Sequence, residues 1–223
     1  MAQSDAKLKI KQAAQSLFAE RGIDGVTVRE IVKAADQRNM ASLHYYFSNK
    51  ENLIKELVVD AARLMDGRRN VAIDKAEQTG GPTELREVVR VIVDSMLVEP
   101  DDDPRNISYM RFVTKLLSGY RWLFEEAIGA EWNTGYQRCL EHLRRLAPSE
   151  IPMEIINQRL LYMSITVMNV AAAREESIAT ADRNHPYWNA PQWRENLIDS
   201  LVGLIIVPPS TETLSPGSAA ASA

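Results

Sequence analysis

The sequence predicts an all-α protein, in which an N-terminal three-helix domain with a helix-turn-helix precedes a larger helical domain. Apolar residues recur with the helical period of about 3.6 in one segment after another. The strongest helix-breaking segments, residues 80–82 (Gly-Gly-Pro) and 99–104, lie between these periodic segments. No segment shows a convincing alternation of apolar and polar residues, which would be typical of a half-buried strand.

The first two helices are marked by signals at their ends. The first is expected over residues 5–21, because Gly22 suits the left-handed position that commonly follows a helix. The second begins after Thr27, which can form a capping box with Glu30. We expect it to stop near Asp36, since aspartate is one of the few residues that tolerate a left-handed turn.

The third helix, residues 40–47, follows Asn39 as its N-cap and has two different faces. Met40, Leu43 and Phe47 share one side, which we expect to be buried. Small residues and polar tips on the other side suit a helix that enters the major groove of DNA. The alternative is an ordinary helical hairpin with an exposed aromatic face. The residues on this outer side are Ala41, Ser42, His44 and Tyr45.

The fourth helix is expected to start at Ser48, with Glu51 completing a second capping box, and to run into the seventies. A helix of this length would connect the N-terminal domain to the rest of the chain. Helical periodicity predicts the later helices at residues 83–98, 107–117, 122–146 (with a break near Gly129 or Gly135), 150–180 and 193–207.

These elements divide the chain into three parts. Residues 1–55 form the helix-turn-helix domain, and residues 56–207 form the second helical domain. Residues 208–223 are rich in Pro, Ser and Ala, with few apolar side chains, and we expect them to be disordered.

Charge and composition restrict the class of protein. The net charge of −4 is unevenly distributed, because residues 1–56 carry nine basic and seven acidic residues, a net +2, and the remainder carries −6. This asymmetry fits a mildly basic DNA-binding domain on an acidic body. The only cysteine, Cys139, excludes an internal disulfide and fits a reducing compartment. We see no signal peptide and no apolar run long enough to span a bilayer, so we expect a cytoplasmic protein without membrane contact.

Several motifs in residues 7–57 together resemble the DNA-binding domain of the tetracycline-repressor (TetR) family. The sequence departs from the usual family pattern in having Asp36 at a turn glycine, one extra residue between Ala35 and Phe47, and the pair His44-Tyr45 in reversed order. The matching motifs are Phe18-Ala-Glu-Arg-Gly22, Thr27-Val-Arg-Glu-Ile31, Ala34-Ala35, Leu43-His-Tyr-Tyr-Phe47 and Asn49-Lys50-Glu51.

The resemblance implies a repressor that binds a double-stranded DNA operator. Ser42 and His44 are expected nearest to base edges, while Lys50 is expected to hold a phosphate together with the amino end of its helix. The full set of candidate DNA-contacting residues is Thr27, Arg29, Arg38, Asn39, Ala41, Ser42, His44, Tyr45 and Lys50.

The resemblance also implies that residues 56–207 bind a small-molecule effector and form a homodimer. Aromatic and Met residues of the body are either core or the lining of a cavity, which favours a largely hydrophobic effector. Such a ligand, placed near Leu64 and Met65, would tilt the DNA-binding domain through the fourth helix. The candidate effector-binding residues are Phe112, Leu116, Trp122, Trp132, Tyr136, Met168 and, as a buried polar group that either fixes helix register or contacts the effector, Asn169.

The last two long helices have more apolar surface than one monomer readily hides. Small residues among them permit close helix crossing, which favours a two-fold interface. The candidate interface residues are Leu160, Ser164, Ala171, Leu197, Leu201, Val202 and Ile205.

We find no pattern typical of an enzyme, neither a Gly-rich phosphate loop, nor a metal-spaced Cys/His set, nor a Ser-His-Asp arrangement. We therefore expect no catalytic residues, metal site or cofactor, and we interpret Cys139 as a buried structural thiol rather than a redox sensor. Two alternatives to the ligand-responsive repressor remain. One is a helical DNA-binding protein controlled by its abundance or by a partner, and the other is an all-α enzyme or carrier.

Overall fold

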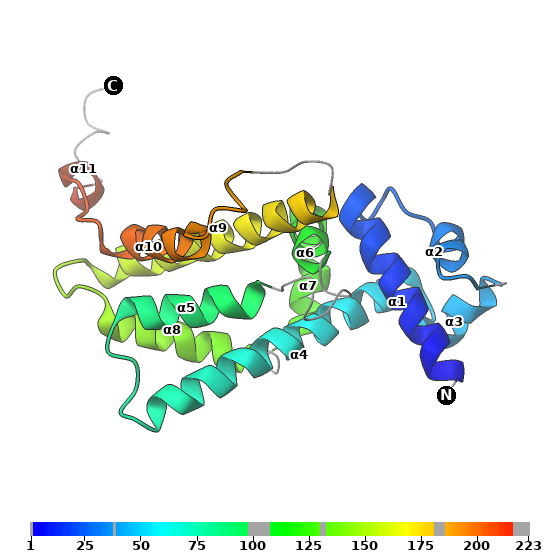
Figure 1. Cartoon of the computed structure of the whole chain (residues 1–223), viewed down its shortest axis with the longest axis horizontal. Helices are drawn as coiled ribbons and strands as arrows, with labels where there is room; N and C mark the ends of the chain where they lie inside the picture. Colours follow the sequence, from blue (N-terminus) through cyan, green and yellow to red (C-terminus); the bar gives the residue numbers. More distant parts are fainter. Residues whose placement is uncertain (1, 38, 98–107, 130–132, 181–185, 216–223) are drawn as a thin grey trace.

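The computed structural model of the protein describes residues 2–37, 39–97, 108–129, 133–180 and 186–215. Within these ranges the chain forms α-helices and no strand, so the predicted all-α class is confirmed (Figure 1). The helices are α1 (Ala2–Arg21), α2 (Val28–Ala34), α3 (Ala41–Phe47), α4 (Lys50–Glu77), α5 (Leu85–Met96), α6 (Tyr109–Gly119), α7 (Arg121–Ile128), α8 (Thr134–Leu146), α9 (Met153–Ala179), α10 (Trp193–Ile206) and α11 (Thr211–Leu214).

Helices α1, α2 and α3, with the start of α4, form a head at one end of the molecule (Figure 1). The predicted capping box of α2 is present, since Thr27 N donates to Glu30 Oε2 at 2.8 Å and Glu30 N donates to Thr27 Oγ1 at 3.3 Å. The Thr27 hydroxyl and N–H groups lower the pKa of Glu30 to about 2. The turn to α3 contains Asp36 with φ of 53°, as expected. These local signals fix the angle between the two helices of the motif.

Helix α4 begins one residue later than predicted, with a different cap. Ser48 closes α3 instead, because its N–H donates to His44 O and its φ is 65°. Asn49 is therefore the N-cap, and its Oδ1 accepts a 2.8 Å bond from Asn52 N. From there α4 runs without a break into the body, as the periodicity predicted (Figure 1).

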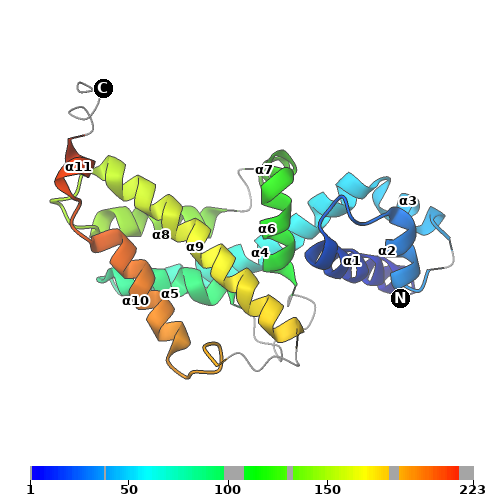
Figure 2. The ribbon, with the colours of Figure 1, turned by 90° about the horizontal axis from the view of Figure 1, so that it is seen from above.

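The body consists of helices packed along the two sides of α5 and α8. Helix α4 covers one side, and α9 with α10 covers the other (Figures 1 and 2). Helices α6 and α7 stand across α4, between the head and the rest of the body. The predicted break at Gly129 is correct, since this residue has φ of 52° at the end of α7. A break at Gly135 is wrong, because Gly135 lies inside the first turn of α8.

Two buried carboxylates hold the N-termini of helices that are distant in sequence. Asp66 of α4 accepts bonds from Gly135 N at 2.7 Å and Thr134 Oγ1 at 2.9 Å, at the start of α8. Glu175 of α9 accepts bonds from Met110 N at 3.0 Å and Arg111 N at 2.9 Å, at the start of α6. Carboxylates are favourable at these positions because unpaired N–H groups and the helix dipole meet them there.

The C-terminal segment departs from the prediction at one point. Residues 211–214 form the short helix α11, capped by Ser210, within the segment predicted to be disordered. In the described part of the chain, no helix is both long enough and apolar enough to cross a bilayer.

Candidate DNA-binding surface and effector cavity

Helix α3 presents the predicted outer face. Leu43 and Phe47 are buried against the head, and Tyr45 is 71% exposed. Met40 was predicted on the buried face but is half exposed, because α3 starts only at Ala41 and the residue lies in the preceding turn. The Tyr45 ring contacts the Tyr46 ring edge-on, with centroids 5.0 Å apart. Ala41, Ser42 and His44 lie on the same outer side as Tyr45.

The His44 ring has one nitrogen engaged and one available. Its Nδ1 lies 2.8 Å from Ser48 O, a backbone acceptor, so Nδ1 carries the hydrogen. In the neutral ring Nε2 is then an acceptor, which suits the exocyclic amino group of adenine or cytosine in the major groove.

Lys50 lies in a different place from the one its predicted role requires. Its Nζ donates to Ile23 O at 2.5 Å and Val26 O at 2.6 Å, and it lies 5.5 Å from the centroid of the Phe18 ring. Burial lowers the pKa of this ammonium group. The side chain therefore holds the segment between α1 and α2 in place, and its charge is directed inward.

Two exposed cations that suit contact with DNA phosphates lie on α2. Arg29 and Lys33 are exposed, one helical turn apart, and neither has an ion-pair partner among the described residues. Lys33 was missed by the sequence analysis, although its i,i+4 spacing from Arg29 was visible. Asn39 uses its side chain locally, since Oδ1 accepts a 2.9 Å bond from Ala41 N. Arg38 lies outside the described residues.

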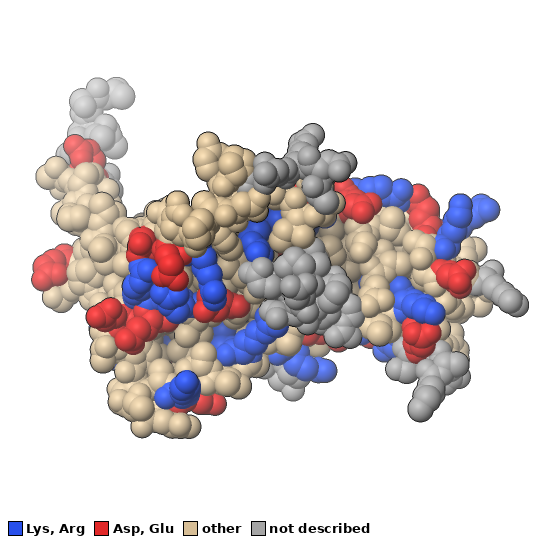
Figure 3. All heavy atoms as spheres, viewed as in Figure 1, with Lys and Arg blue, Asp and Glu red and all other residues tan. Residues whose placement is uncertain are grey.

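Other basic side chains of the head pair with carboxylates. Lys7 and Lys11 of α1 bind Glu56 of α4, and Lys55 binds Glu126 of α7. On the face shown in Figure 3, Lys and Arg side chains lie interspersed with Asp and Glu. Attraction to DNA in this head therefore depends on a few individual cations.

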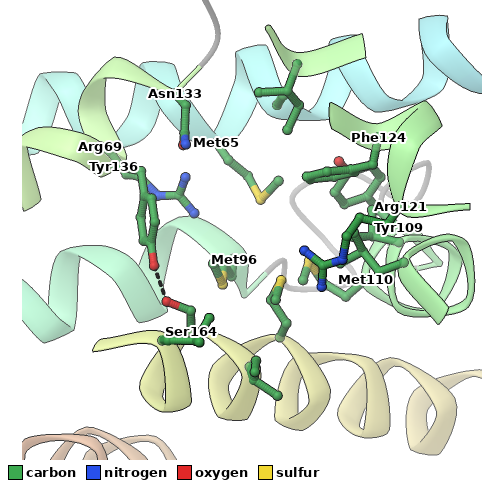
Figure 4. A pocket seen from close by; sticks show the side chains of 17 residues that line it. Met65, Arg69, Met96, Tyr109, Met110, Arg121, Phe124, Asn133, Tyr136 and Ser164 are labelled. Carbon is green, nitrogen blue, oxygen red and sulfur yellow. Dashed lines mark hydrogen bonds between the residues drawn. The ribbon is translucent and has the colours of Figure 1, made fainter. Parts of the chain in front are cut away.

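A cavity of about 220 Å³ lies in the body between α4, α6, α7, α8, α9 and the end of α5 (Figure 4). Its walls are largely apolar and include four methionines, while Arg69, Tyr109, Arg121, Asn133, Tyr136 and Ser164 supply the polar groups. The lining residues are Ala62, Met65, Arg69, Met96, Tyr109, Met110, Val113, Leu117, Arg121, Phe124, Ile128, Asn133, Tyr136, Leu161, Ser164, Ile165 and Met168.

Two of the predicted effector residues, Tyr136 and Met168, line this cavity. Phe112 and Leu116 do not, because they lie fully buried on the side of α6 away from the cavity. Trp122 is 51% exposed and also lies outside the lining. Trp132 lies outside the described residues.

Asn169 was predicted to be buried, but its side chain is exposed. Its Nδ2 donates to Ile165 O one turn earlier, a local bond that leaves no reason to assign it to the cavity. Helical spacing could not distinguish the faces of α9, since apolar residues occur on several of them. For the same reason the burial of Arg69 could not be predicted, since an arginine on a long helix is usually solvent-exposed.

The predicted interface residues are mostly inside the monomer. Leu160, Ala171, Leu201 and Ile205 are at most 3% exposed in the single chain, because α9 and α10 pack these faces inward. Leu197 and Val202 are half-buried against the core, and Ser164 is bonded to Tyr136. The apolar side chains that α9 and α10 do expose include Tyr162, Leu204 and Val207.

Cys139 is buried, in agreement with its interpretation as a structural thiol. Burial raises the pKa of the Cys139 thiol to about 11, so the reactive thiolate is scarce at neutral pH.

Helix α6 connects the cavity to the head. Met110, Val113 and Leu117 line the cavity, while Phe112 stacks on Phe18 of α1 with ring centroids 5.9 Å apart. Further bonds join the same parts, since Lys115 Nζ donates to Glu20 O at 2.6 Å, Gln15 Nε2 donates to Ser108 Oγ at 3.1 Å, and Tyr120 is hydrogen-bonded to Asp24.

The N-terminal part of the chain has relatives of known class. Residues 10–57 match the family model for bacterial regulatory proteins of the tetR family. A protein of Bacillus subtilis (strain 168), described as a probable HTH-type transcriptional regulator, YttP, is 46% identical over 52 residues, which are 23% of this chain and 25% of that protein. The HTH-type transcriptional repressor KstR2 of Mycolicibacterium smegmatis is 32% identical over 68 residues, 30% of this chain and 33% of that protein. These matches span a quarter to a third of the relatives' length.

Solved structures extend the likeness of the fold to nearly the whole chain. A TetR family transcription regulator from Marinobacter aquaeolei VT8 aligns with 92% of this chain and 98% of its own, with a TM-score of 0.61 and 14% identity. The TetR family regulator PfmR from Thermus thermophilus aligns with 90% and 99%, with a TM-score of 0.54 and 15% identity. At these identities the likeness concerns the fold. Residues 10–57 therefore form a DNA-binding domain of the tetR family of bacterial regulatory proteins, and the chain as a whole shares the fold of TetR family regulators.

Proposed function

We propose that this protein is a homodimeric transcriptional repressor that binds a palindromic DNA operator and is released by a small, largely apolar effector. The observation that carries the proposal is the position of α6, one side of which lines the cavity while the other packs on α1 of the head. Met110, Val113 and Phe112 belong to one helix, so a ligand that shifts α6 at Met110 or Val113 would also move Phe112. Effector occupancy and head position are thereby coupled.

Helix α4 supplies a second connection. Met65 and Arg69 reach the cavity wall, and the same helix begins beside α3 in the head. Leu64 is directed away from this cavity, so the ligand position that we inferred from sequence is refined to the side of α4 that carries Met65. A change in the tilt of α4 would alter the distance between the two α3 helices of a dimer.

In the proposed complex with DNA, α3 lies in the major groove and α2 crosses the backbone. Ser42 and the Nε2 acceptor of His44 face base edges, and Thr27 and Tyr45 approach phosphates and sugars. Arg29 and Lys33 replace Lys50 as the phosphate-binding cations, because the Lys50 ammonium is held by two carbonyl oxygens.

The proposed dimer uses the outer faces of α9 and α10, where Tyr162, Leu204 and Val207 leave apolar surface exposed. A two-fold axis through this face would present two heads, and the half-sites of the operator would be about 34–36 Å apart. This arrangement replaces the interface that we predicted through Leu201 and Ile205, which are internal to the monomer.

Selection of bound sequences from a random DNA library tests the proposal. We expect a palindrome with half-sites one helical turn, or a multiple of it, apart. A non-palindromic site bound by a monomer would contradict the dimeric repressor. The second candidate function is a DNA-binding protein that is controlled by a partner protein. The cavity in the body favours control by a small-molecule effector instead. Recovery of no preferred sequence would favour the carrier or enzyme alternatives.

A further inference from the structure

Arg69 of α4 brings a buried cation to the wall of the cavity. The residue is 5% exposed, its Nε donates to Ser95 Oγ at 2.8 Å, and its guanidinium carbon lies 5.1 Å from the centroid of the Tyr136 ring. Neither Nη1 nor Nη2 has a hydrogen-bond partner in the part of the chain that the structure describes. Figure 4 shows the guanidinium group directed into the cavity, between Met65 and Met96.

The acidic residue one turn away on α4 is engaged elsewhere. Asp66 accepts bonds from the N–H groups of Gly135 and Tyr136 and from the hydroxyl of Thr134. Both of its carboxylate oxygens are therefore directed at the N-terminus of α8. Among the described residues, no carboxylate forms an ion pair with the Arg69 guanidinium, and an unpaired buried charge is costly.

Two of the hydroxyl groups that line the cavity, those of Ser164 and Tyr136, have no free hydrogen. Ser164 Oγ donates its single hydrogen to Leu160 O at 2.7 Å. The bond between Tyr136 and Ser164 is then donated by Tyr136, whose hydrogen is also used. Arg69 therefore supplies charged N–H donors beside Tyr136 and Ser164, and Tyr109 of α6 adds a neutral hydroxyl group to the wall.

The rest of the cavity wall suits the apolar part of a ligand. Met65 and Met96 give polarisable, adaptable surface near the guanidinium group, and Met110, Met168 and Phe124 extend the apolar lining. The volume of about 220 Å³ is below the range of about 300–1,000 Å³ that is typical of sites for drug-sized ligands. The ligand must therefore be small.

We propose that the cavity binds a small organic carboxylate, whose oxygens accept the terminal N–H groups of Arg69 and whose apolar body lies among the methionines. The planar guanidinium group can form two parallel hydrogen bonds with a carboxylate. The positive charge of Arg69 and the negative charge of the ligand then neutralise each other. A neutral apolar ligand of the same shape would leave the terminal N–H groups of Arg69 without a charged acceptor. The inference rests on the proposed function, in which this cavity holds the effector.

Isothermal titration calorimetry with hexanoate and its neutral analogue hexanamide tests the charge preference. Wild-type protein should bind hexanoate about 10- to 100-fold more tightly than hexanamide, the ratio expected of a charge-assisted hydrogen bond. Arg69→Met, which keeps the length and apolar stem, should remove this preference. Ser95 is not left unsatisfied by that change, because its hydroxyl also donates to Ile92 O at 2.7 Å.

The matched control is Arg121→Gln, since Arg121 also lines the cavity but is 68% exposed at the side chain and pairs with Glu125. This variant should keep most of the preference for hexanoate, because solvent already screens its charge. Equal binding of hexanoate and hexanamide by wild-type protein, or an unchanged preference in Arg69→Met, would overturn the inference. So would the absence of hexanoate binding at millimolar concentration.

Thermal unfolding without any ligand gives a second test. Arg69→Met should melt at or above the temperature of wild-type protein, because an unpaired buried charge has been removed. A markedly lower melting temperature would show that Arg69 is satisfied by the protein itself and would overturn the inference. Operator binding, measured on the same preparations without ligand, tests the proposed function separately. A wild-type protein that selects hexanoate but binds no operator would contradict only the proposed function.

Discussion

Phe18 of α1 and Phe112 of α6 stack with ring centroids 5.9 Å apart and ring planes inclined by 27°, and this pair joins the head to the helix that lines the cavity. Both side chains are fully buried, so neither ring can move without displacing its partner. The contact gives the wall of the cavity and the head a shared packed core.

Gly135 is required by the close approach of α8 to α4. A Cβ atom at this position would lie 2.8 Å from Arg69 Cβ and 2.9 Å from Asp66 O, neither of which is the end of a flexible side chain. We expect Gly135→Ala to destabilise the protein by roughly 1–3 kcal/mol through overpacking. Thermal unfolding measures the effect.

Gly67→Ala is the matched control, since Gly67 also lies within a helix and an added Cβ would contact nothing within 4 Å. This change should stabilise the protein by about 0.5–1 kcal/mol because alanine favours helices. Equal effects of the two substitutions would contradict the packing described at Gly135.

The proposed interface can be tested apart from the monomer core. Leu204→Glu places a charge on a side chain that is 36% exposed, so the monomer should stay folded while the dimer dissociates. Leu201→Glu, at a fully buried position, should unfold the protein instead. Analytical ultracentrifugation and circular dichroism separate these results.

Val71→Glu serves as the control, because Val71 is 72% exposed on α4, far from α10 in sequence. It should leave the oligomeric state unchanged. A Leu204→Glu protein that remains dimeric would show that the two-fold contact lies elsewhere.

The revised phosphate contacts predict a change in salt dependence. Arg29→Ala and Lys33→Ala should each weaken binding to all DNA sequences and reduce the slope of log K against log salt by about 1. Lys75→Ala, an exposed lysine near the end of α4, should leave the slope unchanged. Fluorescence anisotropy at several salt concentrations measures the slopes. If Lys33→Ala behaves like Lys75→Ala, α2 does not contact the backbone as proposed.

Glu175 should make the stability of the body depend on pH. Burial raises the pKa of its carboxyl to about 8, although the N–H groups of Arg111 and Met110 donate to it. Because the folded-state value exceeds the unfolded value, this group's contribution is fully present below about pH 4.5 and is lost as the pH rises through 8. Stability should therefore fall across that window.

Glu175→Gln keeps a neutral acceptor and removes the titration. At pH 5 its melting temperature should equal that of wild-type protein, and at pH 9 it should be higher by several degrees, since about 1 kcal/mol corresponds to about 2–4 °C at this size. If the melting temperatures of the two proteins change with pH in the same way from pH 5 to 9, Glu175 does not titrate as described.

Most helices could be predicted because their signals are local. Periodicity, the capping box of Thr27 and Glu30 and the left-handed Asp36 all depend on residues close in sequence. The start of α4 was misplaced since Ser48 and Asn49 are both good caps. Asn49 is the cap because the backbone N–H of Ser48 donates to the last turn of α3.

The sites were harder to predict because they depend on what covers each helix face. Leu201 and Leu204 read alike in sequence, but α9 and α5 cover the first and leave the second exposed. Lys50 was assigned to DNA from the resemblance, whereas two carbonyl oxygens from the loop between α1 and α2 bind it. Such contacts join residues distant in the chain, and no periodic pattern reveals them.

Ligand binding in the cavity should change operator affinity through α6. The direct measurement is the dissociation constant of labelled operator, by anisotropy, with and without a saturating amount of the cavity's tightest-binding carboxylate. We predict a loss of affinity of about 5- to 150-fold in wild-type protein, and a smaller loss in Phe112→Leu, which weakens the contact with Phe18. An operator affinity that stays unchanged while calorimetry shows the cavity filled would contradict the account.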